Sequence, residues 1–359
     1  CWNPPTAVWI ECVLVCRRAL PPSRSKANMA FRSGFVSIIG RPNAGKSTLL
    51  NALVGEKLAI VTRKPQTTRN RIQGIINVER KGKKPTQAKE AGVGHPRPAG
   101  QIVLVDTPGV HKPINSLNRR MMKEVYDALE GCDLLLLIAD ATAKFGTGDK
   151  FVLDIVKKSG QPCFLLLNKI DVLDKQRLLP LIAEYKERHD FAEVIPISAM
   201  KREGLDALLA SVMKALPEGP RYFPKDQITD QPERFLVAEL IREQVLLATE
   251  QEVPYATTVL IDQYEEGARL TRIAATIYCE REGQKAILIG KQGSTLKKIG
   301  TAARLQIQGL LNTKVFLELF VKVRAGWRDS RDFVQETDWR TQLHNMSMAK
   351  QKDESEPES

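Results

Sequence analysis

The chain of 359 residues is long enough to form two domains with buried cores, and its 43% apolar and 27% charged residues are typical of a globular protein. Its apolar runs are far shorter than the roughly 20 residues of a membrane-spanning helix. The six cysteines form no C-x-x-C pair and have no nearby histidine, which disfavours a zinc site or a disulfide framework and favours a reducing compartment.

The net charge of +12 is unevenly distributed along the chain. Residues 281–331 contain eleven Lys and Arg against three Asp and Glu, a surplus of eight. A basic excess in one domain favours a polyanionic partner there, although a merely basic soluble surface is the alternative.

Residues 1–28 precede the first periodic segment. The chain opens with Cys1, and this segment has a single acidic residue, Glu11, among several Arg and Ser residues. We interpret it as a targeting extension or as sequence upstream of a true start at Met29, and we exclude it from the predicted fold.

The clearest motif is the eight-residue stretch from Gly40 to Ser47, which has the pattern G-x-x-x-x-G-K-S. A strand-like apolar run at 35–39 precedes it and a helical pattern at 48–54 follows it, which is the context that a phosphate-binding loop requires. Backbone N–H groups and the helix dipole would face a polyphosphate, Lys46 would reach its β- and γ-phosphates, and the Ser47 hydroxyl would bind Mg2+. An ordinary Gly-rich turn is the less favoured interpretation.

Strand patterns then alternate with helical patterns. The predicted strands cover 72–78, 102–105, 132–139, 163–168 and 194–197, and the predicted helices cover 115–130, 150–159, 175–188 and 204–216. This alternation predicts an α/β fold with a mostly parallel sheet, helices on both faces, and a ligand at the carboxyl ends of the strands.

The stretch Asp106-Thr107-Pro108-Gly109 follows one of these predicted strands. In a phosphate-loop protein, an Asp at the end of the neighbouring strand holds Mg2+ directly or through water. The amide of Gly109 can approach a γ-phosphate because glycine has no side chain in the way.

The pattern N-K-x-D at 168–171 lies at the end of another predicted strand and indicates which nucleotide base is bound. The carboxylate of Asp171 can accept hydrogen bonds from N1–H and the 2-amino group of guanine. Adenine offers neither donor, so ATP would leave this carboxylate unpaired. The backbone amides of 198–199, after the next strand, can meet the guanine O6.

Composition divides the chain into parts. We predict a first domain at 29–216 with a patternless, dispensable loop at 79–100, a Pro-rich linker at 217–232, a second domain at 233–331, and a largely disordered polar tail at 332–359.

The second domain has a different element order. A helical pattern at 233–249 precedes strands at 256–262 and 270–279, helices at 284–289 and 294–311 around a G-x-x-G stretch, and a last strand at 315–323. This is the order of an α+β type II KH domain, whose loop holds about four nucleotides. G-x-x-G alone is weak and is commonly a helix–helix turn. The predicted RNA-binding residues are Gly290, Lys291, Gln292, Gly293, Ser294, Lys297 and Lys298.

Over residues 31–327 the sequence resembles the Era family of bacterial Ras-like GTPases, which carry a C-terminal KH domain and belong to the TrmE–Era–EngA-type superfamily. Besides the nucleotide motifs, the resemblance includes Q-T-T-R at 66–69, P-Y-A-T-T at 254–258 and V-K-V-R-A-G-W at 321–327. Residues 1–28 and the long 79–100 loop depart from the family pattern. The resemblance implies GTP hydrolysis, binding of the 3′ end of 16S ribosomal RNA, and a checkpoint role in assembly of the 30S subunit. It also implies a monomer in the cytoplasm that associates peripherally with the inner face of the cell membrane.

The resemblance further suggests how hydrolysis proceeds. By the family pattern Thr68 is the first-switch threonine that senses Mg2+ and γ-phosphate, and Thr67 is the less favoured choice. Val110 stands where Ras-type enzymes carry a water-orienting glutamine, so we expect slow intrinsic hydrolysis. Relatives with Asn at the position of Asn43 use K+ beside the phosphates. We therefore assign catalytic roles to Lys46, Thr68 and Asn43, although Asn43 could instead only stabilise the loop.

The cofactors that we expect are GTP or GDP with Mg2+, and K+ as a further candidate. The predicted Mg2+ ligands are Ser47, Thr68 and Asp106. The predicted nucleotide-binding residues are Gly40, Arg41, Pro42, Asn43, Ala44, Gly45, Lys46, Ser47, Thr48, Asp106, Thr107, Pro108, Gly109, Val110, Asn168, Lys169, Asp171, Ser198 and Ala199.

Together these features predict an RNA-binding GTPase switch whose GTP and GDP forms differ at 57–70 and 107–119. The main alternative is an RNA-binding assembly factor in which the nucleotide is mainly structural. A tRNA-modifying GTPase is disfavoured because the sequence offers no visible catalytic cysteine or cofactor module. A phosphate-loop kinase is disfavoured by N-K-x-D.

Overall fold

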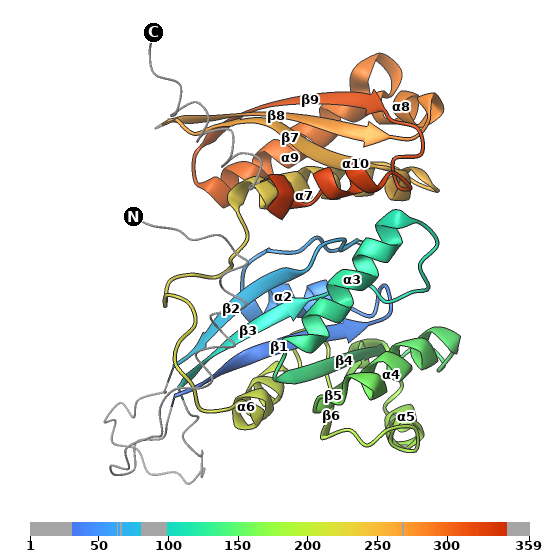
Figure 1. The fold of residues 1–359 in the computed structure, drawn as a ribbon, viewed down its shortest axis with the longest axis vertical. Helices are drawn as coiled ribbons and strands as arrows, with labels where there is room; N and C mark the ends of the chain where they lie inside the picture. The colour runs from blue at the N-terminus through green and yellow to red at the C-terminus, as the bar shows by residue number, and fades with distance from the viewer. Residues whose placement is uncertain (1–30, 63, 65–66, 80–98, 268, 343–359) are drawn as a thin grey trace. The chain divides into compact units, whose positions relative to one another are not determined.

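Six strands form one sheet in the N-terminal domain (Figure 1). The computed structural model describes residues 31–62, 64, 67–79, 99–267 and 269–342. The strand order is β2-β3-β1-β4-β5-β6, and every neighbouring pair is parallel except β2 with β3. The predicted mostly parallel sheet is therefore confirmed. The strands are β1 (Arg32–Gly40), β2 (Ile72–Val78), β3 (Gly100–Asp106), β4 (Leu134–Asp140), β5 (Cys163–Asn168) and β6 (Glu193–Pro196).

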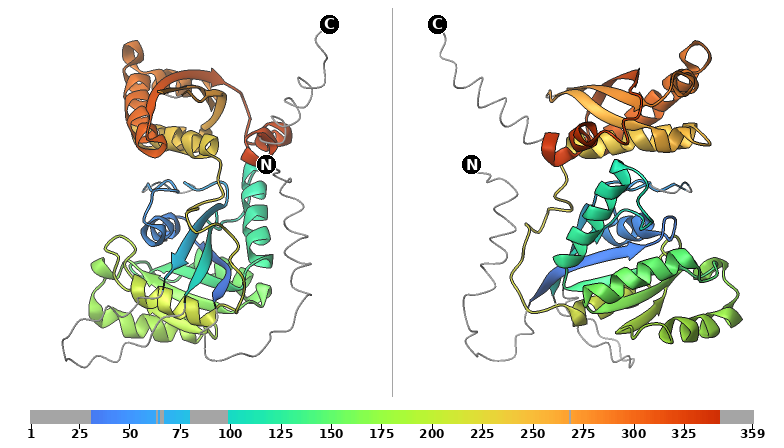
Figure 2. Two further views of the ribbon diagram at one scale, coloured as in Figure 1. Left: turned by 90° about the vertical axis from the view of Figure 1, so that its left-hand side faces the viewer. Right: turned by 45° about the vertical axis from the view of Figure 1, so that its right-hand side comes forward.

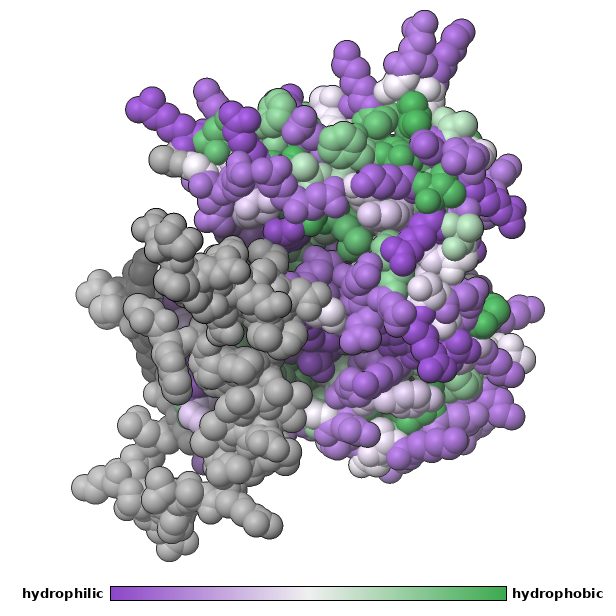
Figure 3. Space-filling model, turned by 45° about the horizontal axis from the view of Figure 1, so that its top comes forward, coloured by the Kyte–Doolittle hydropathy of each residue, from purple (hydrophilic) through white to green (hydrophobic). Residues whose placement is uncertain are grey.

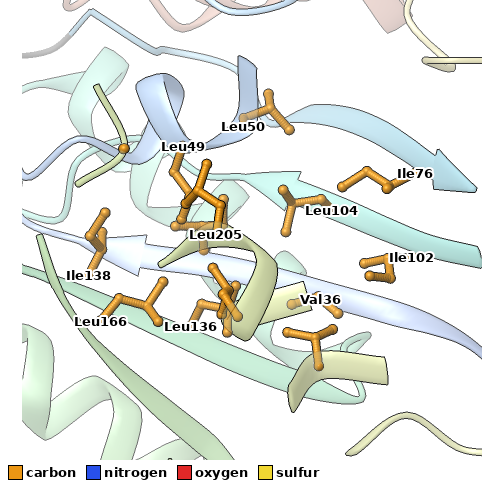
Figure 4. Packing of buried hydrophobic residues seen from close by; sticks show 14 of the residues in the cluster. Val36, Leu49, Leu50, Ile76, Ile102, Leu104, Leu136, Ile138, Leu166 and Leu205 are labelled. Atoms are coloured by element: carbon orange, nitrogen blue, oxygen red, sulfur yellow. The ribbon is translucent and has the colours of Figure 1, made fainter. Parts of the chain in front are cut away.

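Helices cover both faces of this sheet, as the views in Figure 2 show. The helices α2 (Lys46–Val54) and α6 (Leu205–Ala215) share a core with one face, and α3 (Ser116–Glu130), α4 (Thr147–Ser159) and α5 (Leu178–Lys186) share a core with the other. Side chains alternate across a strand, so Ile38 enters the first core and Ile39 the second. Figure 4 shows Leu49, Leu50 and Leu205 packed against strand residues in the first core.

The carboxyl ends of the parallel strands meet at one edge of the sheet. Ile38, near the end of β1, pairs with Asp106 at the end of β3, and Asp140 at the end of β4 pairs with Asn168 at the end of β5. The predicted motifs leave the sheet at this edge, which places the candidate nucleotide site there.

The C-terminal domain contains a three-stranded sheet in the order β7-β8-β9. The strands are β7 (Thr258–Glu265), β8 (Leu270–Cys279) and β9 (Lys314–Val323); β7 is antiparallel and β9 parallel to β8. Helices α7 (Glu233–Ala248), α8 (Glu282–Ile289) and α9 (Ser294–Leu311) share one core with this sheet. The element order α7-β7-β8-α8-α9-β9 confirms the predicted KH fold.

The predicted linker at 217–232 is attached to the first domain. The side-chain oxygen of Gln101 accepts hydrogen bonds from the backbone N–H groups of Tyr222 and Phe223, each at 2.9 Å. The N–H of Ile75 donates to the carbonyl oxygen of Ile228 at 2.8 Å. Residues 217–232 are therefore held against the first domain by hydrogen bonds before α7 begins.

The prediction of a disordered tail is wrong for residues 332–342. A short helix, α10 (Arg331–Glu336), buries Phe333 and Val334 in a cluster with Leu117 and Met121 of α3. Trp339 is only 7% exposed. Three apolar side chains thus fix a segment whose average composition is polar. The rest of the predicted tail, residues 343–359, lies outside the described residues.

Several predicted bounds also shift. The predicted strand at 132–139 begins at Leu134, and the predicted helix at 150–159 begins earlier, at Thr147. The earlier start has a clear cause, because the Asp149 carboxylate accepts from the N–H of Gly146 at 2.9 Å and caps the first turn. The predicted helix at 175–188 is a 3-10 turn, Lys175–Arg177, followed by α5. The predicted strand at 256–262 starts at Thr258 because a 3-10 turn, Val253–Ala256, precedes it.

Candidate nucleotide and RNA sites

The phosphate-binding loop joins β1 to α2 in a tight curve. Asn43 has φ 63° and Gly45 has φ 104°, both in the left-handed region. A Cβ at Gly45 would lie 2.2 Å from Nδ2 of Asn168, and one at Gly40 would lie 2.5 Å from the carbonyl oxygen of Ile138. Glycine is favoured at both positions, because Gly45 combines a positive φ with the nearby Asn168 side chain and Gly40 lies against the backbone of β4.

Lys46 is buried at the start of α2. Its ammonium donates to the carbonyl oxygens of Gly40 at 3.1 Å and Arg41 at 2.8 Å. Burial lowers its pKa to about 8, against the opposing effect of the Asp106 carboxylate. A buried cation whose direct partners are carbonyl oxygens is suited to an anionic ligand, and the N-terminus of α2 adds its dipole at the same place.

Three oxygen-bearing side chains from separate segments gather next to the loop. The hydroxyl oxygens of Ser47 and Thr68 lie 2.7 Å apart, and the Ser47 hydroxyl donates to Oδ2 of Asp106 at 2.7 Å. Thr68 lies 3.4 Å from the same carboxylate oxygen. Thr67 instead donates to the carbonyl oxygen of Lys64 at 2.7 Å. The structure thus brings together the three predicted Mg2+ ligands and places Thr68, not Thr67, among them.

Asp106 supplies the test of whether a cation fits. Its side chain is fully buried, and its Oδ1 atom has no hydrogen-bond partner within the described part of the chain. Burial raises its pKa to about 6. An unpartnered carboxylate oxygen beside two hydroxyls is the donor set that a hard divalent cation prefers, so Mg2+ fits these residues.

The segment after β3 lies against the phosphate-binding loop. The Thr107 hydroxyl donates to the carbonyl oxygen of Ile38 at 2.7 Å, and the N–H of Val110 donates to that of Gly40 at 3.1 Å. A Cβ at Gly109 would lie 2.9–3.0 Å from Pro42, so glycine permits this contact. The Val110 side chain is buried in the second core and offers no polar group to a water molecule.

The predicted base site is built around Asn168. Its buried amide donates to the carbonyl oxygen of Ala44 at 2.8 Å, and its Oδ1 accepts from the N–H of Ala199 at 3.0 Å. Asn168 therefore ties the phosphate-binding loop to the segment 198–199. Asp171 is exposed in the 3-10 turn Ile170–Val172, where its carboxylate is free to meet a base.

Sequence reasoning missed a partner of this site. Lys169, at φ 71°, pairs with Asp140 at the end of β4 at 2.5 Å. Burial opposes ionisation of Asp140, but hydrogen bonds from Lys169 and Thr142 outweigh it and lower the pKa of the carboxyl. Asp140 follows a buried strand in the same way as Asp106, and that position was the available signal.

The G-x-x-G loop joins α8 to α9. Gly290 (φ 72°), Gln292 (φ 50°) and Gly293 (φ 78°) lie at positive φ, and a Cβ at Gly290 would lie 2.2 Å from the Thr295 hydroxyl oxygen. The side chains of Lys291 and Gln292 are exposed. Ser294, Lys297 and Lys298 are also exposed along the first turns of α9. On the face in Figure 3, hydrophilic side chains project from the C-terminal domain between smaller hydrophobic patches. The loop thus presents lysines and a helix N-terminus to one region of solvent, as phosphate binding requires.

A direct contact joins the two domains next to Thr68, and sequence reasoning did not find it. The guanidinium of Arg69 is buried and donates to the carbonyl oxygens of Thr257 at 2.6 Å and Tyr255 at 3.2 Å. From the opposite side, Arg242 of α7 donates to the carbonyl oxygen of Thr67. The stretches 66–69 and 254–258 both carry family motifs, which was the only sequence signal of this contact. The residues 63, 65 and 66 of the predicted first switch lie outside the described residues.

The chain matches known proteins over both domains. The family model described as 50S ribosome-binding GTPase matches residues 35–169, and the KH domain model matches residues 252–328. The chain is 50% identical over 308 residues to the GTPase Era of Geobacter metallireducens, a match that covers 85% of the chain and 97% of that relative. It is 48% identical over 307 residues to the GTPase Era of Syntrophus aciditrophicus, a match that covers 85% of the chain and 94% of that relative.

Two solved structures are similar in fold over 85% of the chain. A variant of Aquifex aeolicus Era bound to GDP.AlF4- has a TM-score of 0.78 at 36% identity, covering 85% of this chain and 98% of its own. Era in complex with MgGDPNP and nucleotides 1506-1542 of 16S ribosomal RNA has a TM-score of 0.77 at 37% identity, with the same coverage.

Proposed function

The chain belongs to the Era family of GTPases, and on that premise we propose that it is a GTP-dependent switch that binds the 3′ end of 16S ribosomal RNA through its KH domain and acts in assembly of the small ribosomal subunit. The observation that carries the proposal is the adjacency of Thr68 and Arg69. The Thr68 hydroxyl lies in the candidate Mg2+ site, and the Arg69 guanidinium is buried against the KH domain. A change at the γ-phosphate that moves Thr68 therefore also moves an anchor of the RNA-binding domain.

In this proposal the nucleotide is held by the residues at the carboxyl edge of the sheet. The amides of 40–48 and the Lys46 ammonium bind the phosphates, and Asp171 reads the guanine edge. Ser47, Thr68 and Asp106 hold Mg2+, which neutralises charge on the phosphates when it is bound. Lys46 and Asp106 are both buried, and the charge of each opposes the effect of burial on the pKa of the other.

We further propose that hydrolysis uses a monovalent cation next to Asn43. The apolar Val110 side chain, buried in the core, cannot orient the attacking water. Asn43, which carries a carboxamide oxygen, lies at positive φ in the phosphate-binding loop. K+ at this place would supply the positive charge that an arginine finger supplies in other GTPases.

The RNA assignment rests on the G-x-x-G loop and on one relative. Lys291, Gln292, Lys297 and Lys298 are exposed in the G-x-x-G loop and the first turns of α9. The similar Era structure contains nucleotides 1506-1542 of 16S ribosomal RNA, and we transfer that ligand to this chain as a proposal. The 30S subunit as partner and a peripheral place at the inner membrane follow from the family resemblance. Among the helices that the structure describes, none is long and apolar enough to cross a bilayer.

Multiple-turnover GTP hydrolysis, measured with and without an RNA of the 16S 3′ end, tests the proposal. A switch predicts repeated turnover whose rate responds to this RNA. The alternative, an RNA-binding assembly factor with a structural nucleotide, predicts one slow turnover at most and no response. A tRNA-modifying GTPase is further disfavoured, because burial raises the pKa of Cys132 to about 11, that of Cys163 to about 12 and also that of Cys279. None of these three described thiols is therefore an activated nucleophile.

A further inference from the structure

A small cavity of about 30 Å3 lies where the first switch, α3, α7 and the segment after α10 meet. Its lining includes Arg69, Arg120, Arg242, Trp327 and Trp339. These residues come from both domains and from the C-terminal segment. We call this cavity the arginine chamber.

Four residues of the chamber each carry a buried N–H group with no hydrogen-bond partner within the described part of the chain. They are Nε of Arg69, Nε of Arg120, Nη1 of Arg242 and Nε1 of Trp339. The side chains of Arg69, Arg242 and Trp339 belong to residues that are 6%, 2% and 7% exposed. Buried donors are almost always paired, and an unpaired one costs about as much as a lost hydrogen bond. Four unpartnered donors on residues that line one cavity indicate a missing acceptor.

The charges in the chamber are unbalanced as well. Three arginines line it, but Glu239 is its one acidic lining residue, and both Glu239 oxygens bond to Arg242, at 2.8 and 2.7 Å. Asp338 lies 3.4 Å from Arg120. Among the described residues Arg69 has no carboxylate partner and donates only to backbone carbonyls. Water molecules could accept these hydrogen bonds, but they would not offset the charge.

We propose that the arginine chamber binds one small monovalent anion of about the size of chloride. A water molecule needs roughly 10–15 Å3 of such space, so a 30 Å3 chamber has room for one small anion. The anion would accept from the four unpartnered N–H groups and offset the excess positive charge.

The position of the chamber gives such an anion a mechanical role. Arg69 directly follows Thr68 of the candidate Mg2+ site, Arg120 lies on α3, and Arg242 lies on α7 of the KH domain. An anion held by all three would bridge the first switch to the RNA-binding domain, and losing it would weaken that contact.

Crystals of the full chain grown in sodium bromide test the site directly, because bromide replaces chloride and scatters anomalously. We expect an anomalous peak inside the chamber. In solution, sodium bromide or chloride should raise the Tm of the full chain by about 2 °C over sodium gluconate at equal ionic strength, since gluconate is too large to enter.

Two conservative variants locate the effect. Trp339→Phe keeps an aromatic ring but removes an unpartnered N–H, so it should weaken the apparent affinity for bromide about fivefold. Ser330→Ala is the matched control, because the Ser330 side chain caps α10 by accepting from the N–H of Phe333 and does not line the chamber. It should leave the bromide affinity unchanged even if the Tm falls. Absence of a bromide peak in the chamber overturns the proposal, and so do equal Tm values in the two salts or equal effects of the two variants. The crystallographic result stands even if a variant fails to fold.

Discussion

The hydroxyl oxygens of Ser47 and Thr68 lie 2.7 Å apart although 21 positions separate them in the chain. Ser47 is fixed in the first turn of α2, whereas Thr68 lies in a segment without regular secondary structure. The next residue, Arg69, is buried against the KH domain. One stretch of backbone therefore connects the candidate Mg2+ site to the RNA-binding domain, and this connection is the physical basis of the proposed switch.

Guanine selectivity should depend on Asp171. In the variant Asp171→Asn the carboxylate no longer accepts from N1–H and the 2-amino group, so GTP affinity should fall about tenfold or more. The new amide can donate to the C2 carbonyl of xanthine, so xanthosine triphosphate should bind better. Competition binding with the two nucleotides measures both effects. Asp154→Asn, at another exposed acidic position on α4, should change neither affinity. Retained GTP preference in Asp171→Asn would place the base elsewhere.

Glu124 should make the attachment of the C-terminal segment pH-dependent. Burial opposes its ionisation, but hydrogen bonds from Arg340 at 2.8 and 3.2 Å and the charges of Arg71 and Arg120 outweigh burial and lower its pKa below 4.5. A lowered carboxyl pKa contributes stability that is present above pH 4.5 and is lost as pH falls through the pKa of the folded state.

We therefore expect Glu124→Gln to reduce the free energy of unfolding by about 2 kcal/mol at pH 7, and by progressively less below pH 4.5. Urea titrations across this pH range measure the difference. Glu130→Gln, an exposed position on the same helix, should have little effect at any pH. A loss that stays constant down to pH 3 would show that the pair is not ionic.

The 79–100 loop should be dispensable for hydrolysis. Strands β2 and β3 pair up to Val78 and Gly100, so the ends of the loop are already held together by the sheet. A short turn in place of residues 80–98, which lie outside the described residues, closes the same hairpin at little entropic cost. GTP hydrolysis should stay within a few-fold of the parent rate. A collapse of activity with the fold intact would make this loop part of the switch.

Hydrolysis should be several-fold faster in K+ than in Na+ at equal ionic strength. Asn43→Gly removes the carboxamide but tolerates the positive φ of this position, so it should abolish the difference between the two salts. Asn43→Asp keeps a side-chain oxygen and should retain part of it. Steady-state rates of GTP hydrolysis in the two salts measure this effect. Equal rates for the parent chain would contradict a role of K+ in hydrolysis.

Local motifs predicted the parts of the molecule that local sequence determines. The glycine pattern of 40–47 and the polar residues after buried strands placed Ser47, Asp106 and Asn168 correctly at one edge of the sheet, because parallel strands bring their carboxyl ends together. The predicted strand and helix bounds were correct to within a few residues, because local sequence determines them. The contacts of Arg69 could not be predicted, since its partners, Thr257 and Tyr255, lie more than 180 positions away.

The burial of the C-terminal segment could not be predicted from the sequence either. Phe333 and Trp339 stand in a polar stretch, and only the tertiary contacts with α3 and the first core give them a place to bury. The arginine chamber likewise forms only when α3, α7 and this segment meet. Composition and periodicity do not predict which distant segments of the chain contact one another.

The most direct test of the switch is the affinity of the full chain for an RNA of the 16S 3′ end, measured by titration with a GTP analogue and with GDP. We expect the RNA to bind about fivefold or more tightly with the GTP analogue than with GDP, because Thr68 and Arg69 couple the two sites. The double variant Lys291→Asp, Gln292→Asp should lose RNA binding in both states while keeping its GTP affinity. Equal RNA affinities in the two nucleotide states would contradict the account.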